Sequence, residues 1–136
     1  MCCRLFLAFL LTVALLRAAE PLEIALGTAV SEEVGLDWTL RDGQRVHLRV
    51  VDQQFHLLFL DAERNIMKPA FERAIVRGEE TRNKTNELNL LLTPGADPSL
   101  THVRRIYPPH DYWLRLLVPV EGTDDYEALP RQRLRQ

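Results

Sequence analysis

The sequence predicts an all-β protein, an antiparallel two-sheet sandwich of the immunoglobulin-like type with about seven or eight short strands. Three observations lead to this fold class. Apolar and polar residues alternate in several short segments, which is the pattern of half-buried strands. Turns rich in glycine, proline, aspartate or asparagine separate these segments. The chain of 136 residues shows no repeat, linker or second domain, and its length suits one hydrophobic core.

The N-terminal residues 1–19 have the three-part layout of a secretory signal. Arg4 precedes an almost unbroken apolar run over residues 5–16, and the small residues Ala18 and Ala19 follow it. A membrane-spanning helix needs about 20 apolar residues, so this run is short for a permanent anchor. We therefore expect a signal peptide that is cleaved near Ala18 or Ala19, with the mature chain exported to the periplasm or the extracellular space. Retention as a membrane anchor is the alternative.

The composition of the mature chain excludes several classes of function. Cys2 and Cys3 lie in the predicted signal peptide, so the exported chain is expected to have no disulfide, thiolate metal site or cysteine nucleophile. The 17 basic and 19 acidic side chains give a net charge of −2, which offers no general attraction to nucleic acid. Residues 20–122 are expected to form the β-sandwich domain. Residues 123–136 are predicted to be a charged, flexible tail, with contact to an anionic surface as the alternative.

A β-hairpin is predicted where two alternating segments, residues 36–40 and 46–50, flank an Asp-Gly turn. A three-residue loop over residues 41–43 places apolar side chains of both strands on one face, with Gly43 in the left-handed conformation that such loops require. The resulting pairs are Trp38 with Val46 and Leu36 with Leu48. A two-residue loop would instead pair apolar with polar side chains, so we prefer the longer loop.

The other strands follow the same reasoning. Residues 55–60 are apolar on both faces, as in a central strand that is buried on both sides. Further strands are expected at residues 22–26, 66–67, 88–92, 102–107 and 112–118. Residues 69–77 fit two structures: a two-turn helix that begins at Pro69 and ends at Gly78, or a strand over residues 74–77. We prefer the strand, because a helix of this length is marginal without packing.

A cluster of aromatic residues provides the candidate binding surface. Trp113 alternates with apolar neighbours and therefore shares a face with Arg115. An exposed tryptophan near Tyr107, His110 and Tyr112 would form a platform for a sugar ring or a peptide. In the alternative, residues 28–35 or the C-terminal tail cover that face.

Histidines provide the alternative site, a periplasmic copper or zinc site. His47, His56, His102 and His110 are the only imidazoles, and neutral imidazole suits both metals. No two of them have a tight ligand spacing, and Met67 is the only methionine after the predicted signal peptide. Histidines without a metal, on the surface or at strand edges, are the competing interpretation.

Catalysis is not expected. Ser31 and Ser99 are the only serines, and neither lies in a Gly-x-Ser-x-Gly turn. His110 and Asp111 are adjacent, so on a strand they would point to opposite faces. Asp and Glu residues are numerous enough for a glycosidase pair, but nothing in the sequence singles out two of them.

Residues 55–62 and 105–114 resemble segments of small exported bacterial proteins of unestablished activity, which are expected to be immunoglobulin-like sandwiches. The resemblance implies a cell-envelope setting and supplies no cofactor or catalytic residue. We therefore expect an exported, non-enzymatic binding or structural module without a cofactor. Its partner is expected to be a protein or glycan of the cell envelope, and a copper- or zinc-binding protein is the alternative.

Overall fold

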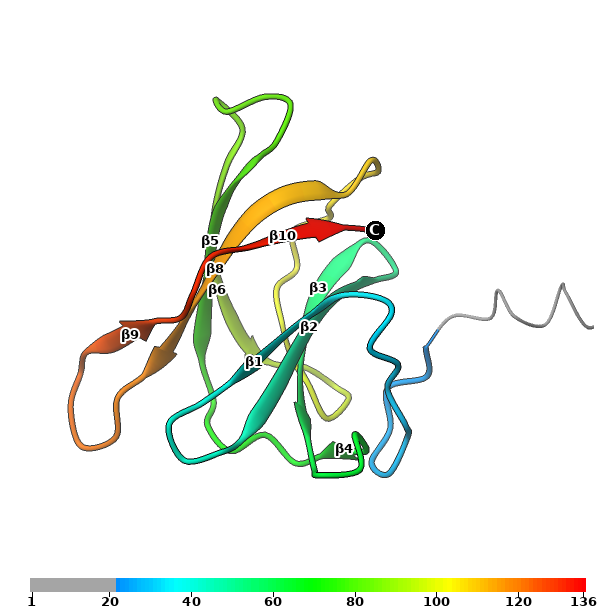
Figure 1. The fold of residues 1–136 in the computed structure, drawn as a ribbon, viewed down its shortest axis with the longest axis vertical. Helices are drawn as coiled ribbons and strands as arrows, with labels where there is room; N and C mark the ends of the chain where they lie inside the picture. The colour runs from blue at the N-terminus through cyan, green and yellow to red at the C-terminus, as the bar shows by residue number, and fades with distance from the viewer. Residues whose placement is uncertain (1–21) are drawn as a thin grey trace, which may run out of the picture.

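Ten β-strands and no helix make up residues 22–136, the part of the chain that the computed structural model describes (Figure 1). The strands are β1 (Leu36–Thr39), β2 (Arg45–Val51), β3 (Gln54–Leu60), β4 (Ile66–Met67), β5 (Ala74–Glu80), β6 (Glu87–Pro94), β7 (Leu100–Thr101), β8 (Asp111–Pro119), β9 (Tyr126–Ala128) and β10 (Gln132–Arg135). Accordingly, no helix in this part has the length and apolar character needed to cross a membrane. The predicted signal peptide, residues 1–19, lies outside the described residues.

The strands form one antiparallel sheet in the order β1-β2-β3-β7-β6-β5-β8-β10, with β4 beside β3 and β9 beside β8. This sheet curls into a half-barrel, so that β1, β2 and β3 face β5, β8 and β10 across the interior (Figure 1). The short strand β7 joins the two halves by pairing with β3 and with the end of β6. The predicted all-β antiparallel fold is confirmed, whereas a sandwich of two separate sheets is not confirmed.

The main core lies between the two halves of the sheet and consists of their inward-pointing side chains. A smaller cluster on the other face of β3 contains Leu58, Leu60, Val30 and Ile66. Strand β3 is therefore buried on both faces, as the apolar run over residues 55–60 predicts. The largest fully buried members of the main core are Leu48, Phe55, Leu57, Phe59, Leu88, Leu92, Leu100, Leu114, Leu116 and Leu134.

The β1–β2 hairpin has the predicted three-residue loop. Trp38 pairs with Val46 and Leu36 with Leu48. The Leu40 N–H donates to the Gln44 carbonyl oxygen at 2.8 Å, and Gly43 has a φ of 88°. Because only glycine adopts this conformation without steric cost, Gly43 fixes the register that directs Trp38 into the core.

Segment 69–77 contains a strand rather than a helix, as we preferred. Strand β5 begins at Ala74, and its buried residues Ala74 and Val76 alternate with the outward-pointing Ile75 and Arg77. Ahead of the strand, Phe71 packs edge-on against Phe59 with the ring centroids 4.8 Å apart. The interior therefore fixes the extended conformation of this segment.

Two predicted strands are wrong. Residues 22–26 form no strand; Leu22 and Ile24 pack on the smaller cluster around Leu58 instead, and Leu26 is exposed. Residues 102–107 are irregular, because the strand in this region ends with β7 at Thr101. The Ile106 N–H makes a single bond to the Gln53 carbonyl oxygen, and the two prolines that follow have no N–H for a ladder.

The prediction of a flexible tail over residues 123–136 is also wrong, because this segment contributes β9 and β10. Leu129 and Leu134 are buried in the main core. The charges that suggested a solvated tail point outward instead, where Arg133 makes two bonds of 3.0 Å to the Asp111 carboxylate. Alternation of inward leucine and outward arginine is a strand pattern. The packing of this strand on the core therefore explains both the burial of Leu134 and the outward-pointing positions of the arginines.

Side chains of the C-terminal segment close the half-barrel against β1 and β2. Trp38 Nε1 donates to the Pro130 carbonyl oxygen at 2.8 Å, and Gln132 Nε2 donates to the Asp37 carbonyl oxygen at 2.7 Å. The Gln136 amide bonds both the N–H and the carbonyl of Val50, at 3.0 and 2.6 Å. The C-terminus therefore lies beside the β2–β3 hairpin (Figure 1).

We expect Leu134→Ala to reduce the free energy of unfolding by about 2–5 kcal/mol, because it removes a fully buried side chain and leaves a cavity. The matched change Arg135→Ala, at the exposed neighbouring position, should cost no more than about 0.5 kcal/mol. Urea unfolding of both variants measures the difference. Equal stability of the two variants would mean that β10 is not packed on the core.

Candidate functional site

The four residues of the predicted aromatic platform do not form one surface. Tyr112 points inward and is buried in the main core, whereas its neighbour Trp113 points outward because side chains alternate along β8. Tyr107 is exposed on the irregular segment that precedes β8. His110 is held by a 2.8 Å contact between its Nε2 atom and the Ile106 carbonyl oxygen. Of the four residues, Trp113 is the one that lines a groove.

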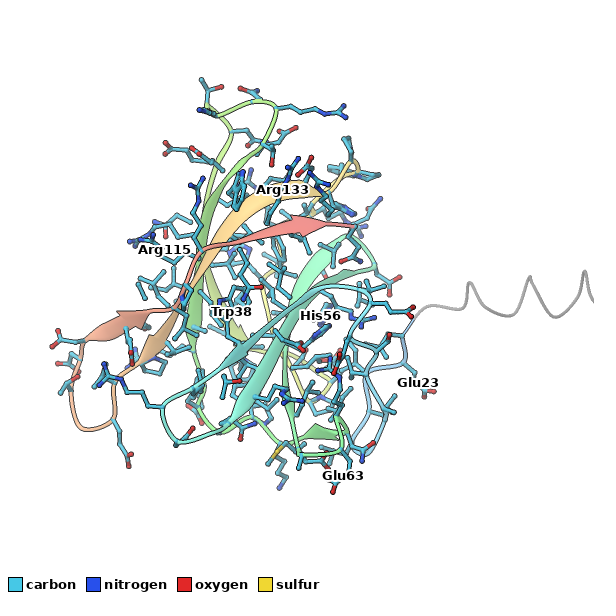
Figure 2. All side chains as sticks on the ribbon, viewed as in Figure 1. Glu23, Trp38, His56, Glu63, Arg115 and Arg133 are labelled. Carbon is cyan, nitrogen blue, oxygen red and sulfur yellow. The ribbon has the colours of Figure 1, made fainter. Side chains whose placement is uncertain are left out.

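A groove of about 480 Å³ lies on the outer face of β5, β6 and β8. We call it the arginine groove and define it by the following residues. They are Arg77, Gly78, Glu79, Glu87, Leu88, Asn89, Trp113, Arg115 and Arg131. Figure 2 shows Arg115 on the outer side of the sheet and Trp38 in the interior. The groove is therefore separated from the main core by the thickness of the sheet.

Strand register explains how the groove acquires its charges. Arg77 on β5 lies directly opposite Arg115 on β8 and, on its other side, opposite Asn89 on β6. Like charges that face each other across a sheet are destabilising. Within residues 22–136, neither of these two arginines makes an ion pair or a side-chain hydrogen bond. The groove therefore holds two uncompensated guanidinium groups side by side.

Arg131, the residue immediately before β10, supplies a third guanidinium group to the groove. Arg131 lies 4.7 Å from the centroid of the Trp113 ring and 3.1 Å from Glu79 Oε1. Arg133, opposite Trp113 in the β8–β10 pair, lies 5.9 Å from the same centroid. A guanidinium over an aromatic ring is an attractive cation–π contact. The C-terminal segment thus lies against Trp113, as the alternative interpretation anticipated, and leaves the indole partly exposed.

A buried polar network lies on the other half of the sheet and joins Asp37, His47, Arg49 and Arg64. His47 Nδ1 lies 2.5 Å from Asp37 Oδ1, and Arg49 Nε donates to His47 Nε2 at 2.9 Å. Because Nε2 accepts a bond from a guanidinium, it carries no proton and His47 is neutral. Burial, with the neighbouring Arg49 charge, holds the His47 pKa below its usual value although Asp37 opposes this.

The same network fastens the segment before β1. Arg64 Nε donates to the Val30 carbonyl oxygen at 2.8 Å, and Arg49 Nη2 donates to the Ser31 and Val34 carbonyl oxygens at 3.3 Å. Arg64 also bonds Asp37, and despite the opposing effect of burial these bonds lower the Asp37 pKa. Each member is held by its neighbours, so this network is a structural clamp.

Ser99, His56 and Asp97 form a second polar cluster, which the sequence analysis did not identify. Ser99 is buried, and its hydroxyl donates to Asp97. His56 Nδ1 lies 2.9 Å from Ser99 Oγ and 3.8 Å from Asp97 Oδ2. In a catalytic triad the serine bonds one ring nitrogen and the carboxylate bonds the other, whereas here both approach Nδ1. The hydroxyl is therefore not activated as a nucleophile.

The four histidines of the alternative metal site have other partners. His47 and His56 belong to the two clusters above, His110 contacts the Ile106 carbonyl, and His102 Nδ1 accepts a bond from the Arg104 N–H. No group of three or more His, Cys, Asp or Glu side chains in residues 22–136 is arranged to hold a metal ion.

No protein-family model matches the chain, and no curated protein or solved structure was found to match it. Functional inference therefore rests on the geometry of the residues themselves.

The sequence analysis missed Arg77, Asn89 and Arg131 as groove residues. Alternation along residues 74–77 and 88–92 does indicate that Arg77 and Asn89 point away from the core. Nothing local indicates that β5 pairs with β8, however, and the groove exists only because of that pairing. Arg131 was assigned to a flexible tail, for which contact with an anionic surface was the alternative interpretation.

Stability should fall as the pH is lowered from about 7.5 to about 5.5, because the unfolded chain protonates its histidines near their ordinary pKa of about 6.5. Burial holds the pKa values of folded His47 and His56 below that value, so the folded protein binds fewer protons in this range. His47→Gln should flatten the dependence, measured as the free energy of urea unfolding at each pH. An unchanged slope in His47→Gln and His56→Gln would contradict this assignment.

Proposed function

We propose that this chain is an exported, non-enzymatic binding module and that it binds its ligand in the arginine groove. One observation carries the proposal: Arg77 and Arg115 stand opposite each other on the outer face, and within residues 22–136 neither makes an ion pair, although Glu79 and Glu87 line the same groove. A sheet that places two like charges together gives up some stability. A ligand with a negative group would neutralise that repulsion. Ligand binding would therefore explain why two arginines occupy these opposite positions.

The two buried clusters support the proposal by contrast. Among the described residues, no buried side-chain nitrogen or oxygen lacks a hydrogen-bond partner. The fully buried polar atoms of the His47 and Ser99 clusters therefore have partners within the protein, whereas the Asp37 and Asp97 side chains, 34 % and 32 % exposed, also reach solvent. Only outward-pointing side chains, such as those of the arginine groove, can gain new partners when a ligand binds.

A non-enzymatic role is supported by the Ser99 cluster, because Ser99 and Asp97 both approach His56 Nδ1 and the arrangement is not that of a catalytic triad. Export is supported by the sequence pattern of residues 1–19. An exported module of this size has an envelope protein or glycan as its partner. Its negative net charge argues against nucleic acid.

Fluorescence offers a direct test, because Trp38 and Trp113 are the only two tryptophans and Trp38 is buried in the core. In a Trp38→Phe variant, shown by urea unfolding to be folded, the emission reports on Trp113 alone. We expect at least one of four probes to shift this emission: a neutral oligosaccharide, a carboxylated oligosaccharide, an acidic peptide or vesicles with anionic lipids. The absence of any shift up to about 5 mM solute would overturn the proposal.

Trp113→Ala in the otherwise unchanged chain provides the second test. It should weaken binding of the active probe by about tenfold, about 1.4 kcal/mol, because it removes the ring that holds Arg131 over the groove. Calorimetric titration measures the affinity, and thermal unfolding should change little because Trp113 lies outside the main core. A large loss of stability with unchanged affinity would make Trp113 a structural residue and contradict the proposal.

A further inference from the structure

We infer that the ligand of the arginine groove is an acidic saccharide, a short chain of sugar rings that carry carboxylates. This inference rests on the proposed function and names the chemical class of its ligand. Three features of the groove support it: the paired guanidinium groups, the acidic and amide side chains beside them, and a centre formed by β5 and β8, which are both paired on two sides.

The paired guanidinium groups select a carboxylate. Residues directly opposite each other on neighbouring strands have Cβ atoms about 5 Å apart, so Arg77 and Arg115 can reach one negative group between them. Guanidinium and carboxylate are both planar and form two parallel N–H···O bonds. Arg131, held against the Trp113 ring and Glu79, adds a third positive group at the side of the groove.

Acidic and amide side chains in the same groove require a ligand that also donates hydrogen bonds. Glu87 and Asn89 line the groove beside the arginines, and Glu87 lies opposite Glu79. These carboxylates would repel a flat anionic membrane or a polyphosphate, which present negative charge without hydroxyl donors. A carboxylated sugar carries both groups, so its hydroxyls can donate to Glu87 while its carboxylate meets the arginines.

The floor of the groove disfavours an extended acidic peptide. Peptides that bind to sheets usually add a strand at an open edge and use their main-chain hydrogen bonds. Strand β5 pairs with β6 and β8, and β8 pairs with β5 on one side and with β9 and β10 on the other. A ligand over β5 and β8, away from the edge of β6 that over residues 87–92 has no partner strand in the described part of the chain, is therefore recognised by side chains alone, which suits rings that carry polar groups around their rims.

Because the net charge of the chain is negative, the protein as a whole does not attract anions, and an anionic ligand must be bound by contacts within the arginine groove. The whole chain carries a charge of −2, so an anion is not drawn to the protein as a whole. Binding of an acidic saccharide must come from local contacts with Arg77, Arg115 and Arg131. Added salt should weaken it, because Arg77 and Arg115 are exposed to solvent.

The test compares an oligogalacturonate with its methyl ester, which has the same sugar chain but no negative charge. Calorimetric titration should show that the acid binds about tenfold more tightly or better than the ester. The double variant Arg77→Ala with Arg115→Ala should lose about tenfold or more of the affinity for the acid and should fold at least as well, because it relieves the repulsion. The control, Arg104→Ala with Arg105→Ala, makes the same change in net charge outside the groove and should retain the affinity.

Other results of these experiments would overturn the inference, the site or the proposed function. Equal binding of acid and ester, or binding of another probe class at Trp113 without either oligosaccharide, overturns the inference and leaves the proposed function intact. Equal affinity for inorganic phosphate indicates a general anion site and overturns the saccharide assignment. An equal loss in the Arg104 and Arg105 control indicates long-range attraction and overturns the site. If no probe class shifts the Trp113 emission, the proposed function itself fails.

Discussion

The pairing of β8 with β5 on one side and with β10 on the other determines both the closure of the core and the position of the groove. A Cβ atom at Gly78 would lie 2.1 Å from the Trp113 carbonyl oxygen, so the close approach of β5 and β8 depends on glycine at this position. The same register places Arg77 opposite Arg115. Because one set of backbone bonds fixes all these positions, the groove is as rigid as the sheet that carries it.

Buried polar side chains have hydrogen-bond partners within residues 22–136, whereas Arg77 and Arg115 on the outer side of this sheet do not. Inside, the His47 and Ser99 clusters satisfy every donor and acceptor, because an unpaired buried polar group costs about 1–3 kcal/mol. Outside, water screens the repulsion between Arg77 and Arg115, so the fold tolerates them without partners. The contrast separates polar residues that hold the structure together from polar residues that are free to act on something else.

The sequence predicts the local features of this fold well and the non-local ones poorly. Gly43 and the alternation around it determine the β1–β2 register, and the doubly apolar run over residues 55–60 identifies the central strand. The polar residues 52–54 predict a turn between β2 and β3, but not its two-residue loop, because Asp52 and Gln53 adopt φ values of 50° and 66° that favour glycine or asparagine. Strand β10 was missed because alternating arginines look like a solvated tail until β8 is placed beside it.

Alternation along β8 explains why the four residues of the predicted platform do not share one surface. Tyr112 and Leu114 point into the core, while Trp113 and Arg115 point out. The inward-pointing side chains of β8 therefore stabilise the core, and these two outward-pointing side chains form part of the groove. Because the two sets lie on opposite faces, residues on the outer face can change without disturbing the packing beneath them. A binding face of this kind can be adapted to a ligand at little cost to the fold, provided that Gly78 and the β5–β8 register are kept.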